Sequence, residues 1–505
     1  MAAARAGVGP RDFCDREHDR QADVYRRFGL SFDYFGRSSS HSNHALTQHF
    51  YRQLDAAGLI DERIVPQVWS PTDGRYLPDR YVLGTCPHCG AAEARGDQCD
   101  TCGTLLDPVD LIGPRSALSG DARLELRESR HLFLRQSALV DRLNGWLDTR
   151  SGWPPFVVSL ARSWLTADLK DRCITRDLAW GVPVPRPGFE GKVFYVWFDA
   201  PIAYIAATQD WADTRGRDWR EWWWGDAACA SRYIQFLGKD NVPFHTVSFP
   251  GTLLGSGEPW RTVDVVKGFH WLTHEGGKFS TSQGRGLSCE AALNALPSDL
   301  WRWWLIANAP ESADVDFRAT RFAADVNKDL ADVFGNLVQR VTRFTQKAFD
   351  GRVPEGGELG GAERALAATV KERVAAIRAH HEAREFRHAA AETRALWSAA
   401  NAYVQAAAPW SKLRENRLGA AVATRTALRL IEICATVAWS IIPNLATSAI
   451  AAVGGTVGAC SPAWPDDIEG QLLLGRSVGT VLPEAFEPVA KFDAEHVHLS
   501  AYEER

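Results

Sequence analysis

Two closely spaced cysteine pairs, Cys86 with Cys89 and Cys99 with Cys102, constrain the fold of this chain more than any other feature. Each pair has the Cys-x-x-Cys spacing, which turns two thiolates toward one point, and each is followed by a glycine that lets backbone amides approach the sulfurs. Four soft ligands of this kind predict a closed tetrahedral zinc site that folds its segment and takes no part in chemistry. His88 lies inside the first pair, and we expect it to be solvated and not to be a fifth ligand.

The composition limits the class of protein and the compartment in which we expect it. The 505 residues are 45% hydrophobic and 24% charged, which is ordinary for a folded protein of two or three domains, and the formal net charge of -5 gives no overall attraction to nucleic acid. The other six cysteines are scattered, as suits a reducing compartment. The start of the chain lacks an apolar segment, and residues 428–453 are interrupted by Glu432 and Pro443. We therefore expect a cytoplasmic protein without a membrane span, and a buried helix followed by a loop in 428–453.

Apolar periodicity divides the chain into an α/β part and a helical part. Two helices are predicted on either side of a loop at 28–40, followed by an irregular, glycine- and proline-rich knuckle at 65–114. Strands are predicted at 192–199 and 268–273, where apolar segments alternate with helical ones as in a parallel α/β sheet. Further helices, which would form a bundle after residue 319, are predicted at 325–349, 361–385, 389–408 and 420–442.

Seven landmarks follow one another along the chain. They are FGLSFDYFGR, YLPDRYVLGTCPHCG with EARGDQCDTCG, KDRCITRDLAWGVPVP, KVFYVWFDAPIAY, LGKDNVPFH, KFSTS, and FGNLVQR with APW. Their order resembles the methionyl-tRNA synthetases, a family of class I aminoacyl-tRNA synthetases, from about residue 5 to about residue 450. The resemblance implies a Rossmann-type catalytic domain that binds methionine and ATP with Mg²⁺, an inserted zinc knuckle, and an all-α bundle that reads the anticodon of a methionine tRNA.

The resemblance assigns an amino-acid pocket to Trp197, Pro201, Tyr204, Asn241 and His245. The residue types suit a thioether substrate, because an apolar and polarizable side chain fits an aromatic wall. A hydroxyl or an imidazole can in addition give the sulfur a weak hydrogen bond. Without the resemblance, the two aromatic residues would be interpreted as ordinary core.

The resemblance assigns the anticodon contact to Asn336, Arg340 and Trp410. Asn336 and Arg340 are four residues apart and share one face of a predicted helix, and Trp410 follows a proline that starts or breaks a helix. An unstacked base needs a flat aromatic ring to stack on and amide or guanidinium donors for its edges. On a helix by themselves, an asparagine and an arginine would more simply form a solvated face.

The phosphate-handling motifs depart from the family pattern. In the loop KFSTS, Lys278, Ser280 and Ser282 match the Lys-Met-Ser-Lys-Ser motif, but Thr281 stands where the family has a catalytic lysine. Losing one such donor typically costs roughly 10²–10³ in rate. The His-Ile-Gly-His type motif has no counterpart, since the chain is expected to begin inside a helix that follows it in the family. A start assigned too late and a true truncation both explain this.

The predicted architecture is an α/β, Rossmann-type class I synthetase catalytic domain, its first half missing, with a zinc-knuckle insertion and a following all-α anticodon-binding bundle. The predicted segments are 1–64 (remainder of the first catalytic half), 65–114 (zinc knuckle), 115–318 (connective region and second catalytic half), 319–451 (anticodon-binding domain) and 452–505 (tail).

The favoured function is ATP-dependent activation of methionine and its transfer to tRNA(Met). Two alternatives stay open. One is a diverged paralogue that activates another, related amino acid in specialised metabolism together with a separate partner enzyme. The other is a catalytically dead tRNA-binding protein, because the phosphate loop is altered while the anticodon residues are retained.

Overall fold

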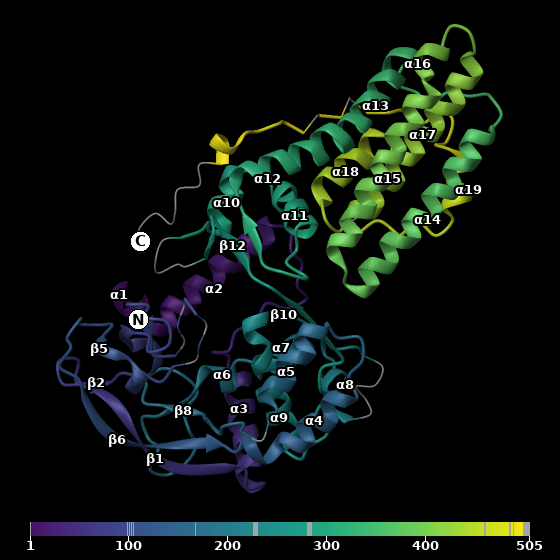
Figure 1. Cartoon of the computed structure of the whole chain (residues 1–505). Coiled ribbons are helices and arrows are strands. Elements are labelled where there is room, and N and C mark those ends of the chain that lie inside the picture. The colour runs from purple at the N-terminus through teal and green to yellow at the C-terminus, as the bar shows by residue number, and fades with distance from the viewer. Residues whose placement is uncertain are drawn as a thin grey trace. The chain divides into compact units, whose positions relative to one another are not determined.

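The computed structural model describes residues 2–97, 99, 101–102, 104, 106–166, 168–225, 231–279, 285–458, 461–483, 486–487 and 489–497. The chain forms two compact units, the first from residues 1–22 and 32–268 and the second from 23–31 and 269–505 (Figure 1). The division at Gly268 falls ahead of the predicted start of the helical domain, so the KFSTS segment belongs to the second unit.

The first unit mixes helices with short strands. Its helices are α1 (Ala2–Arg5), α2 (Pro10–Arg27, which continues into the second unit), α3 (His41–Ala56), α4 (Val140–Asp148), α5 (Pro155–Trp164), α6 (Val196–Asp199), α7 (Ala203–Arg215), α8 (Arg220–Trp223) and α9 (Phe249–Gly255), with short turns η1 (Asp79–Tyr81), η2 (Pro108–Asp110), η3 (Gln136–Leu139), η5 (Lys239–Asn241) and the π-helical η6 (Phe244–Ser248). Its strands are β1 (Ile60–Ser70), β2 (Arg75–Tyr76), β3 (Val82–Thr85), β4 (Ala94–Arg95), β5 (Ile112–Ser116), β6 (Glu125–Leu134), β7 (Arg172–Cys173), β8 (Thr175–Arg176), β9 (Val193–Phe194), β10 (Ile234–Gly238) and β11 (Val265–Phe269).

A long antiparallel ribbon supports the cysteine segment. Strand β1 pairs with β6 along its length, and β3, β4 and β5 form a separate small sheet in the chain between them. The prediction that irregular chain begins at residue 65 is therefore wrong, because β1 continues to Ser70. The charged residues near its start and Pro66 in its middle hide the strand pattern, since the outer face of this ribbon is exposed.

The predicted strand over 192–199 is also wrong. Only Val193 and Phe194 form a strand, and after Tyr195 the chain makes the helical turn α6. The turn places Phe198 and Ile202, four residues apart, where both are buried, and α6 and α7 pack on α3. Tertiary packing thus overrides the strand preference of the aromatic residues.

The second unit begins with a small sheet and continues as a helical bundle. Its strands are β12 (Leu272–His274), β13 (Gly277–Lys278) and β14 (Val315–Phe317), and its helices are α10 (Cys289–Ala295), α11 (Ser298–Ala307), α12 (Ala319–Val326), the π-helical η8 (Asn327–Gly335), α13 (Asn336–Phe349), α14 (Gly361–Ala383), α15 (Phe386–Ala407), α16 (Pro409–Lys412), α17 (Arg417–Ala438), α18 (Pro443–Ala452), α19 (Ile468–Leu474) and η9 (Ala494–Val497). Figure 1 shows α14, α15 and α17 side by side, and contacts join α14 to α15 and α15 to α17.

Strand β12 pairs in parallel with β14 and antiparallel with β13. The strand predicted over 268–273 is interrupted, because the backbone N–H of His270 donates to Pro310 and that of Trp271 to the Asp314 carboxylate. The interruption separates β11 from β12.

The four predicted long helices of the second unit are confirmed as α12 to α13, α14, α15 and α17. The loop predicted after the apolar helix is wrong in part, since α18 starts at Pro443. A proline at the first helical position fits a helix start, because its missing N–H would lack an intrahelical partner there anyway. No helix in the described part of the chain is long and apolar enough to cross a membrane.

The residues after α18 complete the core of the second unit. Ile468 and Leu472 of α19 are buried with Leu482, Phe486 and Phe492 in the same apolar cluster as the bundle helices. The sequence did not disclose a role for this segment, and the structure gives it one, which is to cover the bundle.

Trp397 of α15 lies at the centre of that cluster. It is 0% exposed, and its ring lies 4.7 Å from the rings of both Trp303 and Phe334. Burial of an indole among aromatic neighbours is one of the largest single contributions to a core.

We expect Trp397→Ala to destabilise the second unit by about 3–5 kcal/mol, because the cavity left behind cannot collapse fully. Thermal unfolding followed by circular dichroism measures the loss. Leu474→Ala is the control, since Leu474 is 80% exposed and its truncation should leave the unfolding temperature unchanged. Equal unfolding temperatures for Trp397→Ala and the wild type would contradict this description of the core.

Candidate functional site

The predicted cysteine cluster is present. The sulfur of Cys86 lies 3.9 Å from that of Cys102, and the sulfur of Cys89 lies 3.6 Å from that of Cys99. All four sulfurs lie within 4.8 Å of one another. Four thiolates at about 2.3 Å from a zinc ion in a tetrahedron are about 3.8 Å apart, so the donor set fits such an ion.

The backbone around the cluster is shaped for it. Gly90 has a φ of 75°, which a side chain would strain, and its N–H donates to the carbonyl of Cys86. The hydroxyl of Thr104 lies 3.3 Å from the Cys102 sulfur and lowers the pKa of Cys102, whereas burial and the neighbouring thiols raise the pKa of Cys89. A thiol with a low pKa is readily a thiolate, the form that binds a metal. His88 is exposed and outside the cluster.

The aromatic part of the predicted amino-acid pocket gathers around one short turn. Trp197 of α6 stacks on Phe244 of η6 with ring centroids 4.2 Å apart and an angle of 14° between the planes. Pro201 lies between α6 and α7, and together with Trp197 it borders a small cavity. Arg172 also borders this cavity, and its guanidinium lies over the Phe244 ring at 4.8 Å.

A chain of hydrogen bonds joins the three other predicted pocket residues. The hydroxyl of Tyr204 lies 3.0 Å from Nε2 of His245, and Nδ1 of His245 lies 2.9 Å from the backbone carbonyl of Asn241. A carbonyl only accepts, so Nδ1 carries a hydrogen and donates it. His245 is 5% exposed, and burial lowers its pKa, which favours the neutral ring. Nε2 is then an acceptor, and Tyr204 donates to it.

These two hydrogen bonds determine which donors and acceptors the predicted pocket still offers. Tyr204 donates its hydroxyl hydrogen to His245, and His245 donates its ring hydrogen to the Asn241 carbonyl. What Tyr204 offers to a neighbouring group is therefore its oxygen lone pairs. Burial of the hydroxyl also raises the pKa of Tyr204, so the phenol stays protonated.

Asp199 lies in the same turn and was not singled out by the sequence. Its side chain is 7% exposed, and its Oδ1 is buried without a hydrogen-bond partner among the described residues. Burial raises the pKa of Asp199 to about 7, because a carboxylate loses its hydration there. No sequence pattern separates this aspartate from an exposed one, since its environment comes from α3 and α6 packing together.

The predicted phosphate loop is described only at its start. Lys278 ends β13, and its ammonium lies 3.5 Å from the centre of the Trp271 ring. Gly277 lies against the Arg285 side chain, so a second cation stands beside the same strand. Ser280, Thr281 and Ser282 lie outside the described residues.

Two of the three predicted anticodon residues, Arg340 and Trp410, lie against each other. Asn336 begins α13 and is exposed, and Arg340 lies one turn further. The guanidinium of Arg340 lies over the Trp410 ring at 5.2 Å and donates to the side chains of Gln405 and Asn401, each at 3.3 Å. Trp410 belongs to α16, which begins at Pro409, so the proline starts a helix. The sequence did not single out the two residues of α15 that hold Arg340.

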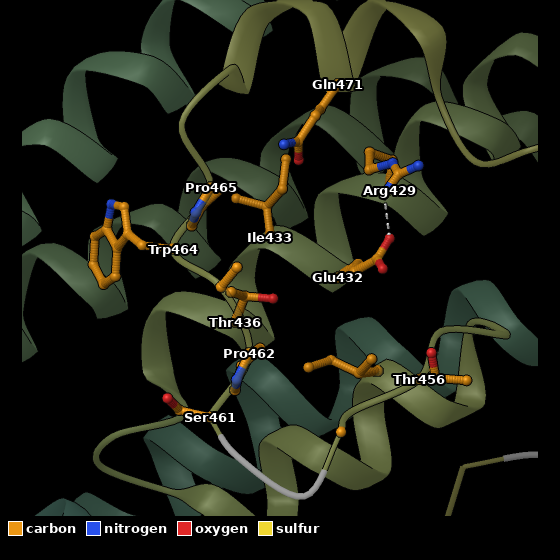
Figure 2. A pocket seen from close by; sticks show the side chains of 13 residues that line it. Arg429, Glu432, Ile433, Thr436, Thr456, Ser461, Pro462, Trp464, Pro465 and Gln471 are labelled. Atoms are coloured by element: carbon orange, nitrogen blue, oxygen red, sulfur yellow. Dashed lines mark hydrogen bonds and ion pairs between the residues drawn. The ribbon is translucent and has the colours of Figure 1, made fainter.

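A larger cavity of about 510 Å³ lies inside the second unit, between α17, α18 and the segment after them (Figure 2). Arg429 and Arg476 both pair with Glu432, at 2.6 and 2.8 Å. Arg429 also donates to the carbonyl of Gly475. These contacts tie the final segment to α17, and no predicted site residue borders the cavity.

Comparisons with known families agree with this geometry. A family model described as tRNA synthetases class I (M) matches residues 1–342, and one described as the anticodon binding domain of methionyl tRNA ligase matches residues 353–491. A class I synthetase fold followed by a helical anticodon domain, with a four-cysteine cluster in the first part, thus describes the molecule.

Comparison with individual proteins shows which family of class I synthetases the chain resembles. The chain is 52% identical over 483 residues to the methionine–tRNA ligase of Ruegeria sp. (strain TM1040), covering 94% of this chain and 84% of that protein. It is also 52% identical over 487 residues to that of Caulobacter vibrioides (strain NA1000 / CB15N), covering 95% and 85%. A solved Mycobacterium tuberculosis methionyl-tRNA synthetase in complex with methionyl-adenylate matches with a TM-score of 0.74 and 25% identity, over 96% of this chain and 87% of that one. The chain belongs to the methionyl-tRNA synthetase family.

We expect the purified protein to carry one zinc ion per chain and Cys86→Ser or Cys102→Ser to lose it, because three thiolates no longer close the tetrahedron. Metal analysis of the purified variants measures the content, and limited proteolysis reports the loss of structure between β1 and β6. Cys289→Ser is the matched control, since this exposed cysteine lies outside the cluster. A full complement of metal in both variants would show that other ligands hold it.

A second prediction concerns Asp199. Because folding raises its pKa from 3.8 to about 7, this carboxyl stabilises the fold at low pH, and that contribution disappears as the pH rises toward 7. Asparagine does not ionise, so the stability of Asp199→Asn relative to the wild type should rise between pH 5 and pH 8, by up to about 3 kcal/mol.

Thermal unfolding of both proteins at the two pH values measures this difference. Asp213→Asn, which changes an exposed carboxyl on α7, is the matched control and should follow the wild type at both pH values. Parallel unfolding curves for Asp199→Asn and the wild type at both pH values would exclude a titrating Asp199.

Proposed function

We propose that this protein is a methionine–tRNA ligase, which activates methionine with ATP and transfers it to the terminal ribose of a methionine tRNA. The observation that carries the proposal is the joint presence of two recognition surfaces in one chain. The first unit holds the stacked wall of Trp197 and Phe244 beside the chain from Tyr204 to Asn241. The second unit holds Arg340 over Trp410.

The amino-acid pocket suits a flexible, unbranched thioether. The flat face of Trp197 offers polarizable contact to a sulfur and its methyl group. The imidazole of His245 and the phenol of Tyr204 are both uncharged, so this polar side of the pocket offers no charge to the substrate side chain. Charged side chains of similar length would lose their hydration there without gaining a partner.

Activation requires the substrate carboxylate to attack the α-phosphorus of ATP, which is used with Mg²⁺. Negative charge spreads over the phosphate oxygens in the transition state, so a fixed cation aimed at them lowers the barrier. Lys278 is our candidate for that cation, and Ser280, Thr281 and Ser282 supply hydroxyl donors. Thr281 brings no charge, so more of the electrostatic stabilisation falls to Lys278.

Transfer requires recognition of the tRNA. Trp410 presents a ring for stacking, and Asn336 presents an amide to a base edge. Arg340 is positioned by Asn401 and Gln405 and keeps part of its guanidinium available for an acceptor. The division into segments 1–64, 65–114, 115–318, 319–451 and 452–505 forms part of the same proposal, with a structural zinc ion in the second.

The test combines two assays on the purified chain. ATP–pyrophosphate exchange with methionine reports activation, and charging of a methionine tRNA transcript reports transfer. Trp410→Ala should lower kcat/KM for tRNA by about 5- to 150-fold, since stacking on one base contributes about 1–3 kcal/mol. Exchange should stay as in the wild type, because it needs no tRNA. Arg343→Ala, which truncates an exposed arginine on α13, is the control.

The two alternatives give different outcomes. Exchange with another amino acid but not with methionine would identify a diverged paralogue. Binding of the tRNA transcript without exchange for any amino acid would identify a tRNA-binding protein that no longer catalyses activation. Neither outcome is compatible with the proposed ligase.

A further inference from the structure

No carboxylate balances the charge of Arg340 in the part of the chain that the structure describes. Its guanidinium donates only to the side-chain oxygens of Gln405 and Asn401, each at 3.3 Å, and both of these acceptors are neutral. Its Nε is shielded from solvent without a partner, and burial lowers its pKa because the charge loses hydration. A partly buried cation costs free energy unless an acceptor compensates it, so the site favours an acceptor from outside the chain.

The amide of Asn401 has a fixed direction. Its nitrogen donates to the backbone carbonyls of Val333 and Trp397, each at 3.0 Å. Both hydrogens of the amide are thus used, and its oxygen is left to accept from Arg340. The opposite orientation would place the oxygen against two carbonyls and the nitrogen against a guanidinium, and neither contact would be a hydrogen bond.

These three hydrogen bonds tie Arg340 to the core of the second unit. Trp397 is 0% exposed, and its ring lies 4.7 Å from the ring of Phe334, the residue after Val333 in η8. Asn401 of α15 therefore links Arg340 of α13 both to its own helix and to the π-helical segment that precedes α13.

A neutral side chain at this position has a consequence that an acid would not have. An aspartate could also accept from Arg340, but its negative charge would balance the guanidinium. An aliphatic side chain would leave the charge in place but would remove the acceptor that orients it. Asparagine orients the cation and leaves it uncompensated.

We propose that Asn401 is a positioning residue for tRNA recognition, which holds Arg340 over Trp410 in one orientation and keeps its charge available to an acceptor of the tRNA. This inference deepens the proposed function and rests on it. Asn401 does not itself bind the tRNA and acts through Arg340. Phosphate oxygens and the acceptors on the edges of unpaired bases are partners that a guanidinium binds.

Two substitutions remove different parts of this arrangement. Asn401→Leu keeps the approximate volume but removes the acceptor and both donors. We expect the Kd for a methionine tRNA transcript to rise about three- to tenfold, the range that one neutral hydrogen bond supports. Asn401→Asp keeps an acceptor but compensates the charge of Arg340. We expect its Kd to rise by about tenfold or more, as for the loss of a hydrogen bond to a charged group.

The experiment is equilibrium binding of the transcript to the full chain at one fixed salt concentration, because such affinities depend on salt. Each substitution is also made in an Arg340→Ala background. If Asn401 acts through Arg340, both substitutions should change the Kd there by less than about twofold. Charging kinetics should show the loss in KM for tRNA and not in kcat. Thermal unfolding identifies the folded variants, and Asn401→Asp, which keeps the shape of the side chain, carries the test if Asn401→Leu is unfolded.

Asn308 of the same unit offers a matched control. Its amide donates to the carbonyl of Trp304, four residues before it, and accepts from Arg321, each at 3.1 Å. Asn308→Leu and Asn308→Asp thus make the same changes beside an arginine that is no part of the predicted anticodon surface. Their Kd for the transcript should equal that of the wild type.

The outcomes separate this inference from the proposed function. If the wild type charges the transcript and the folded Asn401 variants bind it as tightly as the wild type, the role of Asn401 is overturned and the proposed function stands. If their losses persist undiminished in the Arg340→Ala background, Asn401 does not act through Arg340, which also overturns the inference. If the wild type neither charges nor binds the transcript, the proposed function fails and this inference fails with it.

Discussion

The hydrogen bond from Nδ1 of His245 to the Asn241 carbonyl sets the directions of the hydrogen bonds in the proposed amino-acid pocket. Because a carbonyl cannot donate, this bond fixes which ring nitrogen carries the hydrogen, and burial keeps the ring neutral. The direction of the Tyr204 hydroxyl follows from it. The acceptor is a backbone carbonyl, so no side-chain substitution at Asn241 removes it.

Three of the cation–ring contacts in the described part of the chain involve residues at or beside the proposed sites. Arg172 lies over Phe244 beside the amino-acid pocket, Lys278 over Trp271 before the phosphate loop, and Arg340 over Trp410 in the bundle. A ring face attracts a cation and restricts its motion without neutralising it, unlike a carboxylate. Each charge is thus held in place yet keeps its ability to bind an anion or a base.

The features that the sequence predicted correctly depend on residues that are close together in the chain. The cysteine cluster follows from two short repeats, and the long bundle helices follow from apolar periodicity. Prediction failed where tertiary contacts decide the conformation, as in the helical turn after Phe194 and in β1, whose exposed face weakens the strand pattern. Asp199 gave no signal, because its burial comes from segments distant in sequence. The pocket and bundle assignments came from the resemblance alone, since asparagine, arginine and tryptophan are common in ordinary helices.

Two π-helical segments stand next to the two recognition surfaces, η6 with His245 and η8 directly before Asn336. Such segments contain more residues per turn than an α-helix and are frequent near functional sites. The number of residues in η8 therefore determines the direction in which the side chains of α13 point around the helix axis. Removing a single residue there would rotate the following side chains by up to about 100° around the helix axis. Asn336 and Arg340 would then leave the side of the bundle where Trp410 lies, although no residue of that surface had been changed.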